Sequence, residues 1–252
     1  MTNWWGDFPN LRSELRDLFV LSHAESTNDK ARELVAADYL GVITHNQTAG
    51  RGRLGRPWES LPGQGVALSI ITPSLDLKLR SWLPILAGSA VAHELIARGV
   101  EGAQVKWPND VLIREGKVSG ILCEALPSGR IVVGIGLNVQ FESDRRPTPD
   151  ARAVSDEIPV SHQVIDEFLG SVVRTIKTYC GMPPGDLRDS LQTFATSLMG
   201  TLGRTVKVQD VDGLEWRGLA RSLTEGGHLL VENSVTGELR TVVASDVTHL
   251  RQ

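Results

Sequence analysis

Three apolar segments joined by very short connections constrain the fold of this chain more than any other feature. The turns between them are Arg114-Glu115-Gly116 and Pro127-Ser128-Gly129. Connections of this length join antiparallel neighbours, as in a hairpin. We therefore predict three strands that pair antiparallel, in the segments AQVKWPNDVLI (103–113), KVSGILCEAL (117–126) and GRIVVGIGLNVQ (129–140).

Helical patterns surround this region. Ser26 and Asp29 have the spacing of a capping box, so a short helix is expected from there to about Val35. Apolar residues recur at helical spacing from Leu83 to Arg98, which predicts a core helix. The other predicted elements are strands at 41–48 and 65–72, a polar loop at 142–160, and amphipathic helices at 164–176 and 187–198.

The pattern changes near Gly203 to short β runs separated by glycine and asparagine turns. About fifty residues of such strands predict a small barrel-like domain. We therefore expect an α+β protein with a main domain over residues 1–200 and a second domain over 201–252.

Composition and charge limit the class of protein. The chain has 252 residues and can bury a substantial core. Its formal net charge of −4 argues against broad nucleic-acid binding. Cys123 and Cys180 are too few for a disulfide framework, and we find neither a signal-peptide pattern nor an apolar run long enough for a membrane span, so we expect a cytoplasmic protein. The scattered histidines predict no tightly held metal site.

The stretch AGRGRLGRPW (49–58) contains the pattern G-x-G-x-x-G, which is typical of dinucleotide-binding loops. That interpretation needs a helix that begins at the glycines, because the helix N-terminus holds the pyrophosphate. Pro57 and Pro62 follow with two further glycines, so no helix can begin there. No H-R-D or D-F-G element follows, which also excludes a protein kinase.

What remains is a glycine-rich loop that carries Arg51, Arg53 and Arg56, with no acidic residue before Glu59. Glycine permits close backbone approach, and arginine offers a planar fork of donors that suits carboxylate or phosphate. This composition favours an anion-binding loop, and a solvated hairpin tip is the alternative that the loop alone leaves open.

Two further features bear on the choice. Lys106 lies beside Trp-Pro in an apolar strand, where a lysine either extends to solvent or meets an anion. Gly120, Gly134 and Gly136 lie inside predicted strands, which indicates either bulges or the close approach of a ligand to the backbone.

Four motifs occur in a fixed order: ESTN (25–28), QTAGRGRLGR (47–56), KWPNDV (106–111), and GKVSGILCE (116–124) with GIGLNV (134–139). In combination they closely resemble the biotin protein ligase family, the biotin–acetyl-CoA-carboxylase ligases or holocarboxylase synthetases, over about residues 20–140. The resemblance implies a catalytic domain like those of class II aminoacyl-tRNA synthetases, with a mixed sheet backed by helices, and a C-terminal SH3-like β-barrel.

The resemblance also implies the reaction and its partners. Biotin and Mg-ATP would give biotinyl-5′-AMP, and the biotinyl group would pass to a lysine of a biotin carboxyl carrier protein domain. Family members that repress transcription carry an N-terminal winged helix-turn-helix, and only about twenty residues precede the matching region here. We therefore expect a monofunctional ligase that binds no nucleic acid or membrane, and the sequence leaves open whether it forms a homodimer.

The resemblance assigns roles to particular residues. Lys106 would stabilise charge between carboxylate and α-phosphate, and Arg53 would hold the adenylate as part of a closing loop. As a hypothesis, Asp110 or a neighbouring polar group orients the acceptor amine. Substrate-binding residues would be Ser26, Thr27, Asn28, Gln47, Gly50, Arg51, Gly52, Arg53, Lys106, Gly120, Gly134 and Gly136, and nucleotide-binding residues would be Arg51, Arg53, Trp58, Lys106, Asn109, Lys117 and Asn138.

The chain departs from the family in one place, and other classes of protein compete with this interpretation. Many members carry an Ala-Thr-Ser-Leu turn where residues 153–156 read Ala-Val-Ser-Asp, which puts adenosine contacts there in doubt. Lipoate and octanoyl ligases share the adenylate chemistry, but they carry an Arg-Arg followed by a glycine-rich run and a His-Asp pair, and this sequence has no such element. A non-catalytic biotin- or nucleotide-binding module would not require both Lys106 and Arg53.

Overall fold

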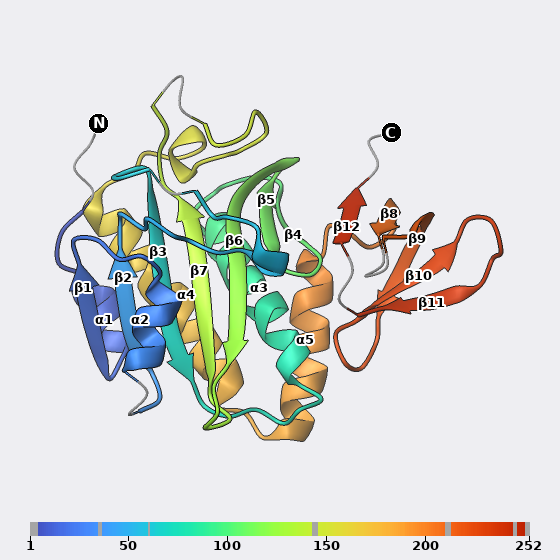
Figure 1. The fold of residues 1–252 in the computed structure, drawn as a ribbon, viewed down its shortest axis with the longest axis horizontal. Coiled ribbons are helices and arrows are strands. Elements are labelled where there is room, and N and C mark those ends of the chain that lie inside the picture. Colours follow the sequence, from blue (N-terminus) through green and yellow to red (C-terminus); the bar gives the residue numbers. More distant parts are fainter. Residues whose placement is uncertain are drawn as a thin grey trace.

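A seven-stranded mixed sheet forms the larger part of the computed structural model, which describes residues 5–34, 37–59, 61–142, 146–209, 213–243 and 246–249. The strand order is β1-β2-β3-β7-β6-β5-β4 (Figure 1). Strands β1 and β2 pair parallel, and the other neighbours pair antiparallel. The strands are β1 (Asp17–Leu21), β2 (Leu40–Thr44), β3 (Gly65–Thr72), β4 (Ala103–Lys106), β5 (Asp110–Ile113), β6 (Gly116–Ala125) and β7 (Ile131–Asn138).

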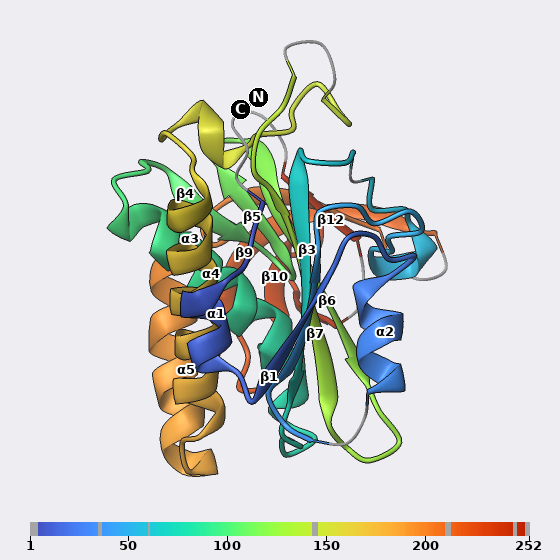
Figure 2. The ribbon, with the colours of Figure 1, turned by 90° about the vertical axis from the view of Figure 1, so that its left-hand side faces the viewer.

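Helices cover the two faces of this sheet unequally. Most of α3 is buried, where it packs on β4, β5, β6 and β7 in the main core. Helix α2 lies on the opposite face, against β2, β3 and β7 (Figure 2). The helices are α1 (Pro9–Glu14), α3 (Leu83–Ala97), α4 (His162–Cys180) and α5 (Pro184–Leu198) on one face, and α2 (Thr27–Glu33) on the other.

Several predicted elements lie where the sequence places them. Ser26 caps α2, and its side chain accepts a hydrogen bond from the Asp29 amide at 3.4 Å. The helix ends at Glu33, while Val35 lies outside the described residues. Strand β3 has the predicted bounds, and β5, β6 and β7 pair antiparallel through short turns. The patterns of period 2 and period 3.6 thus predict most of this domain.

Other predictions were wrong in detail. Residues 103–113 are not one strand but two, β4 and β5, which pair through a turn at Trp107, Pro108 and Asn109. Proline has no amide hydrogen for a sheet ladder, so the strand breaks there. Strand β2 ends at Thr44 rather than at residue 48, and α1 and β1 were not predicted.

A second sheet follows α5. Its strands are antiparallel in the order β11-β10-β9-β8-β12, and within the described residues the edge strands β11 and β12 do not pair to close a barrel. No helix in the described part of the chain is long and apolar enough to cross a bilayer. The strands are β8 (Thr205–Gln209), β9 (Glu215–Leu223), β10 (Leu229–Asn233), β11 (Leu239–Val242) and β12 (Asp246–His249).

Candidate active site

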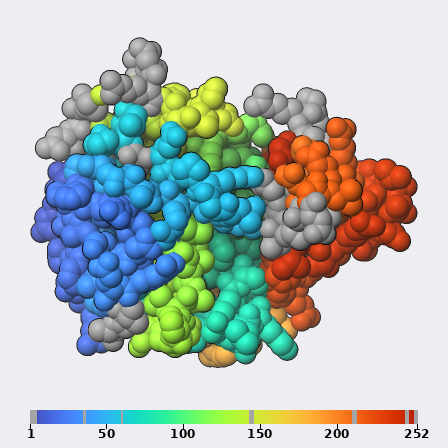
Figure 3. All heavy atoms as spheres, viewed as in Figure 1, coloured from blue at the N-terminus to red at the C-terminus, as the bar shows by residue number. Residues whose placement is uncertain are grey.

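A cavity of about 240 Å³ lies between the start of α2, the glycine-rich loop, the β4–β5 turn and the faces of β6 and β7. The loop before β3 crosses the front of the molecule from the α2 side toward the second sheet (Figure 3). Most of the predicted site residues line this cavity, namely Ser26, Thr27, Asn28, Gln47, Arg51, Gly52, Arg53, Trp58, Lys106, Asn109, Lys117, Gly120, Gly134 and Gly136. The structure therefore brings together motifs that are far apart in the sequence.

Three uncharged polar side chains, those of Thr27, Asn28 and Gln47, line one end of the cavity beside the Arg51–Asp29 ion pair, and this end is called the uncharged end after them. The Gln47 side-chain oxygen accepts hydrogen bonds from the backbone N–H of Thr27 (2.9 Å) and from its hydroxyl (3.2 Å). The hydroxyl of Ser69, buried in β3, lies 2.7 Å from both Thr27 Oγ1 and Asn28 Oδ1. These contacts fix the orientation of three neutral groups at the start of α2, which suits a neutral polar ligand.

Two further residues fix Asn28 although the sequence analysis gave them no role. Its amide donates to Glu124 Oε2 at 2.6 Å and to the carbonyl of Leu122 at 3.3 Å, while Ser69 donates to its oxygen. Ser69 is a polar residue within an apolar strand, and Glu124 ends the quoted motif GKVSGILCE. Both were therefore visible in the sequence, but their contact with Asn28 depends on the fold.

The glycine-rich loop turns back on itself. The Trp58 amide donates to the carbonyl of Gly50 at 2.9 Å, and η1 (Arg53–Gly55) lies at its tip. Gly50 lies just outside the cavity lining, and a Cβ there would come within 2.3 Å of Gln47 Nε2 and 2.5 Å of the Trp58 oxygen. Glycine at this position lets the loop pack against the uncharged end of the cavity.

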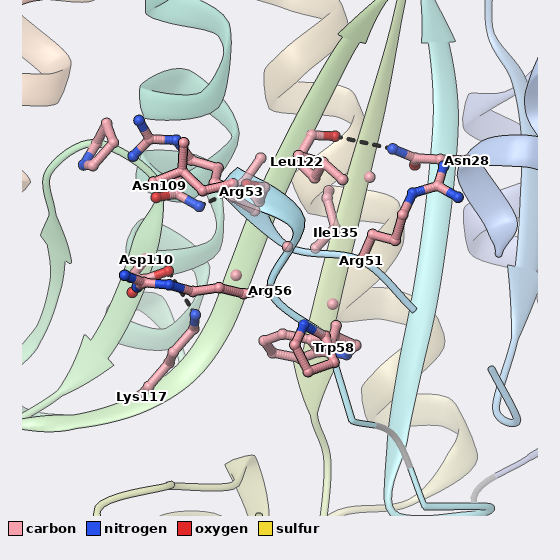
Figure 4. A pocket seen from close by; sticks show the side chains of 18 of the residues that line it. Asn28, Arg51, Arg53, Arg56, Trp58, Asn109, Asp110, Lys117, Leu122 and Ile135 are labelled. Atoms are coloured by element: carbon pink, nitrogen blue, oxygen red, sulfur yellow. Dashed lines mark hydrogen bonds and ion pairs between the residues drawn. The ribbon is translucent and has the colours of Figure 1, made fainter. Parts of the chain in front are cut away.

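The loop arginines point to different sides of the cavity. Arg51 lies toward Asn28, while Arg53 and Arg56 lie toward Asn109 and Asp110 (Figure 4).

The Arg51 guanidinium donates to both carboxylate oxygens of Asp29, each at 2.6 Å. This hydrogen bonding holds the pKa of Asp29 below its ordinary value. Arg51 thus ties the loop to α2, and its contact with an adenylate stays a prediction.

Glycines on the sheet allow side chains to lie directly on the backbone. A Cβ on Gly136 would lie 2.4 Å from Trp58 Cε2, and one on Gly120 would lie 2.9 Å from Trp58 Cζ3. A Cβ on Gly134 would lie 2.3 Å from Asn28 Oδ1. The floor of the cavity is therefore strand backbone on which the side chains of Trp58 and Asn28 lie, as expected where a ligand or side chain must come close.

The other end of the cavity is cationic. Lys106, the last residue of β4, lies opposite Asp110 in the β4–β5 pair. Asp110 forms an ion pair with Lys117 (2.7 Å), and the Lys117 ammonium lies 5.2 Å from the centre of the Trp58 ring. The Asn109 amide donates to the carbonyl of Ile121 at 2.8 Å. Within the described ranges no carboxylate pairs with Lys106, so its charge remains available to an anion.

The second sheet contributes part of the cavity wall, which the sequence analysis did not predict. Val247 and Thr248 of β12 line the same cavity as Lys106. Next to them, His249 Nε2 lies 2.9 Å from Thr201 Oγ1. Burial lowers the pKa of His249 to about 4, and the positive charges of Lys106 and Arg204 act in the same direction. Glu115 opposes this effect.

This lowered pKa predicts a loss of stability in acid. The unfolded chain binds a proton at His249 near its ordinary pKa of 6.5, but the folded protein resists protonation until about 4, so stability falls as the pH drops through that range. When the pH falls from about 7.5 to about 5, the melting temperature of His249→Gln is expected to drop less than that of the wild type. Thermal melts across this range would contradict the prediction if the two proteins lost stability in parallel.

Asn138 lies beside the main cavity rather than in its lining. Its amide donates to the carbonyls of Lys117 (3.2 Å) and Arg152 (3.0 Å). It lines a neighbouring cavity of about 240 Å³ together with Phe141 and Arg146. Its predicted contact with adenine stays a prediction.

The fold and the site define a ligase of the biotin and lipoate type. Residues 22–141 match the model of the Biotin/lipoate A/B protein ligase family. The chain is 35% identical to the biotin–[acetyl-CoA-carboxylase] ligase of Mycobacterium tuberculosis over 248 residues, which cover 94% of this chain and 90% of that protein. The chain therefore belongs to the biotin protein ligase family.

A second relative and a solved structure are also similar to this chain. The bifunctional ligase/repressor BirA of Bacillus spizizenii is 38% identical over 133 residues, which cover 51% of this chain and 41% of that protein. A biotin protein ligase from Aquifex aeolicus in complex with biotin and ATP superposes with a TM-score of 0.77 at 24% identity, covering 94% of this chain and 100% of that one. At this level of identity the similarity shows the fold alone.

Proposed function

We propose that this chain is an ATP-dependent ligase that activates biotin as biotinyl-5′-AMP and transfers the biotinyl group to a lysine of a biotin carboxyl carrier protein. The arrangement of the cavity carries the proposal. Thr27, Asn28 and Gln47 form an uncharged end that suits the ureido ring of biotin, while Lys106 and Lys117 lie at the end where its carboxylate would meet ATP.

In the first step a carboxylate oxygen of biotin attacks the α-phosphorus of ATP. The bond from this phosphorus to the oxygen of the β-phosphate breaks, and pyrophosphate leaves. Bringing the two anions into contact costs about 1 kcal/mol per charge pair in water and about 4 kcal/mol at an effective dielectric constant near 20. We assign Lys106 to offset this repulsion and to stabilise the charge that develops on the phosphate oxygens.

In the second step the deprotonated amine of the carrier lysine attacks the acyl carbon, AMP leaves with the electrons of the broken C–O bond, and the nitrogen of the new amide loses its extra proton to water. The amine has an ordinary pKa near 10.4, so its deprotonation at neutral pH costs about 4–5 kcal/mol. We assign Asp110 to orient this amine. The support for this role is its position in the cavity, where Lys117 fixes its carboxylate at 2.7 Å.

Mg²⁺ supplies neutralisation of phosphate charge when it is bound with ATP. No group of three or more His, Cys, Asp or Glu side chains that could hold a metal occurs in the described part of the chain. We propose that the ion is coordinated mainly by nucleotide phosphates and water.

The glycine-rich loop provides a prediction about retention of the intermediate. Arg53→Gly is expected to release biotinyl-5′-AMP into solution and to raise biotinylation of bystander lysines, because the loop loses a cation that holds the adenylate. Chromatography of free adenylate and blotting of an unrelated protein measure both effects. Arg240→Gly, an exposed site on β11, is the control, and equal release from both variants would exclude this role for Arg53.

Finer assignments stay predictions. We propose that the second sheet is the SH3-like domain of the family, that residues 1–200 form the domain related to class II synthetases, and that the ligase acts without nucleic acid. Light scattering with and without biotin and ATP tests whether the protein forms a homodimer.

Exchange of labelled pyrophosphate into ATP tests the proposed function. We expect exchange that depends on biotin and that lipoate does not support. Exchange with lipoate instead would favour a lipoate ligase. A folded protein that supports no exchange with either acid would contradict the enzyme assignment and favour a binding module.

A further inference from the structure

The turn that carries Lys106 forms hydrogen bonds with residues outside the first sheet. Trp107 follows Lys106 directly and is buried. Its backbone N–H donates to Thr201 Oγ1 at 2.9 Å, and its indole N–H donates to the carbonyl of Gly227 at 3.0 Å, in the β9–β10 turn. Trp107 is therefore fixed at two points by the C-terminal part of the chain, once through its backbone and once through its side chain.

Thr201 connects these contacts to the last strand. It is fully buried, and its hydroxyl oxygen lies 2.9 Å from His249 Nε2 in β12. The preceding residue, Gly200, donates its amide to the carbonyl of Val105 at 2.9 Å. The two sequence neighbours of Lys106 are thus both held by residues 200–201. Val105 accepts a hydrogen bond from Gly200, and Trp107 donates one to Thr201.

The geometry points to Thr201 as a positioning residue for Lys106, through which the C-terminal sheet sets the rate of adenylate formation. This inference rests on the proposed function. Since no carboxylate in the described ranges pairs with Lys106, the position of its ammonium depends on the backbone that carries it. A small displacement of a catalytic group can cost up to about 10²-fold in rate. Loss of the hydrogen bond to Thr201 is therefore expected to slow adenylate formation.

The same turn offers a matched control. The indole N–H of Trp82 donates to the carbonyl of Glu225 at 2.8 Å, two residues before Gly227. Trp82 is also fully buried, but it precedes α3 and lies outside the cavity lining. Trp82→Phe therefore removes one hydrogen bond to the β9–β10 turn and leaves the contacts of Thr201 with Trp107 and His249 in place.

The experiment compares Thr201→Val, Thr201→Ser and Trp82→Phe in the full chain. Thr201→Val is expected to lower kcat for biotin-dependent pyrophosphate exchange about tenfold and to leave the Kd for biotin within about twofold. Thr201→Ser keeps the hydroxyl and is expected to restore kcat. Trp82→Phe is expected to lower the melting temperature as Thr201→Val does, with kcat changed less than about twofold.

Hydrogen–deuterium exchange separates this inference from the proposed function, because it needs no activity. We expect faster amide exchange over residues 103–113 in Thr201→Val than in Trp82→Phe. Equal exchange of this segment in the two variants, or equal losses of kcat, would overturn the inference. An inactive wild type that still shows the predicted difference in amide exchange would contradict the proposed function and leave the positioning of the turn supported.

Discussion

Lys106→Met is expected to reduce biotin-dependent pyrophosphate exchange about 10²–10³-fold, the range measured when one preorganised charge-stabilising donor is removed from an active site. Lys106 lines the cavity at its cationic end, and Lys117 cannot replace it because its ammonium is engaged with Asp110 at 2.7 Å. Binding of biotin alone is expected to change much less than the rate, because the contacts predicted for the ureido ring lie at the α2 end.

The control for this variant is Lys207→Met. Lys207 lies on β8 in the second sheet, where it pairs with Glu215 at 2.9 Å and lies outside the cavity. This surface pair is expected to contribute little to stability or activity. The assignment of Lys106 would be wrong if its replacement reduced exchange no more than the replacement of Lys207.

Gly134→Val is expected to weaken biotin binding at least about tenfold, which corresponds to about 1.4 kcal/mol. A Cβ at this position would lie 2.3 Å from Asn28 Oδ1. Asn28 cannot move aside freely, because Ser69 and Glu124 hold its amide at 2.7 and 2.6 Å. The added side chain must therefore displace the uncharged end of the cavity or the strand beneath it.

Isothermal titration with biotin measures this effect. Gly185→Ala is the control, because a Cβ on this helical glycine would meet no atom within 4 Å. That variant is expected to bind biotin as wild type does. Unchanged biotin affinity in folded Gly134→Val would place the ureido ring elsewhere.

Local patterns account for the parts of the fold that could be predicted from sequence. The Ser26 cap, the bounds of β3 and the antiparallel pairing of β5, β6 and β7 all depend on residues that are close in the chain. The motifs of the candidate site could also be found, because each is a short run of unusual residue types. Their meeting in one cavity required the fold.

The features that sequence reasoning missed depend on distant contacts. Ser69 and Glu124 act on Asn28 from other strands, and Thr201 reaches the backbone of Trp107 from 94 residues away. Val247 and Thr248 form cavity wall only because β12 pairs with β8 beside the β4–β5 turn. No periodicity or turn signal encodes such tertiary contacts, so the contribution of the C-terminal sheet to the site became visible only in the structure.

The central claim is that this chain attaches biotin to a carrier lysine, and intact mass spectrometry of the carrier tests it most directly. A purified biotin carrier domain is incubated with the protein, biotin and Mg-ATP, beside a carrier whose acceptor lysine is replaced by arginine. The account predicts a mass increase of one biotinyl group on the first carrier and none on the second. An unchanged mass of the first carrier, with the ligase folded and biotin and ATP in excess, would contradict it.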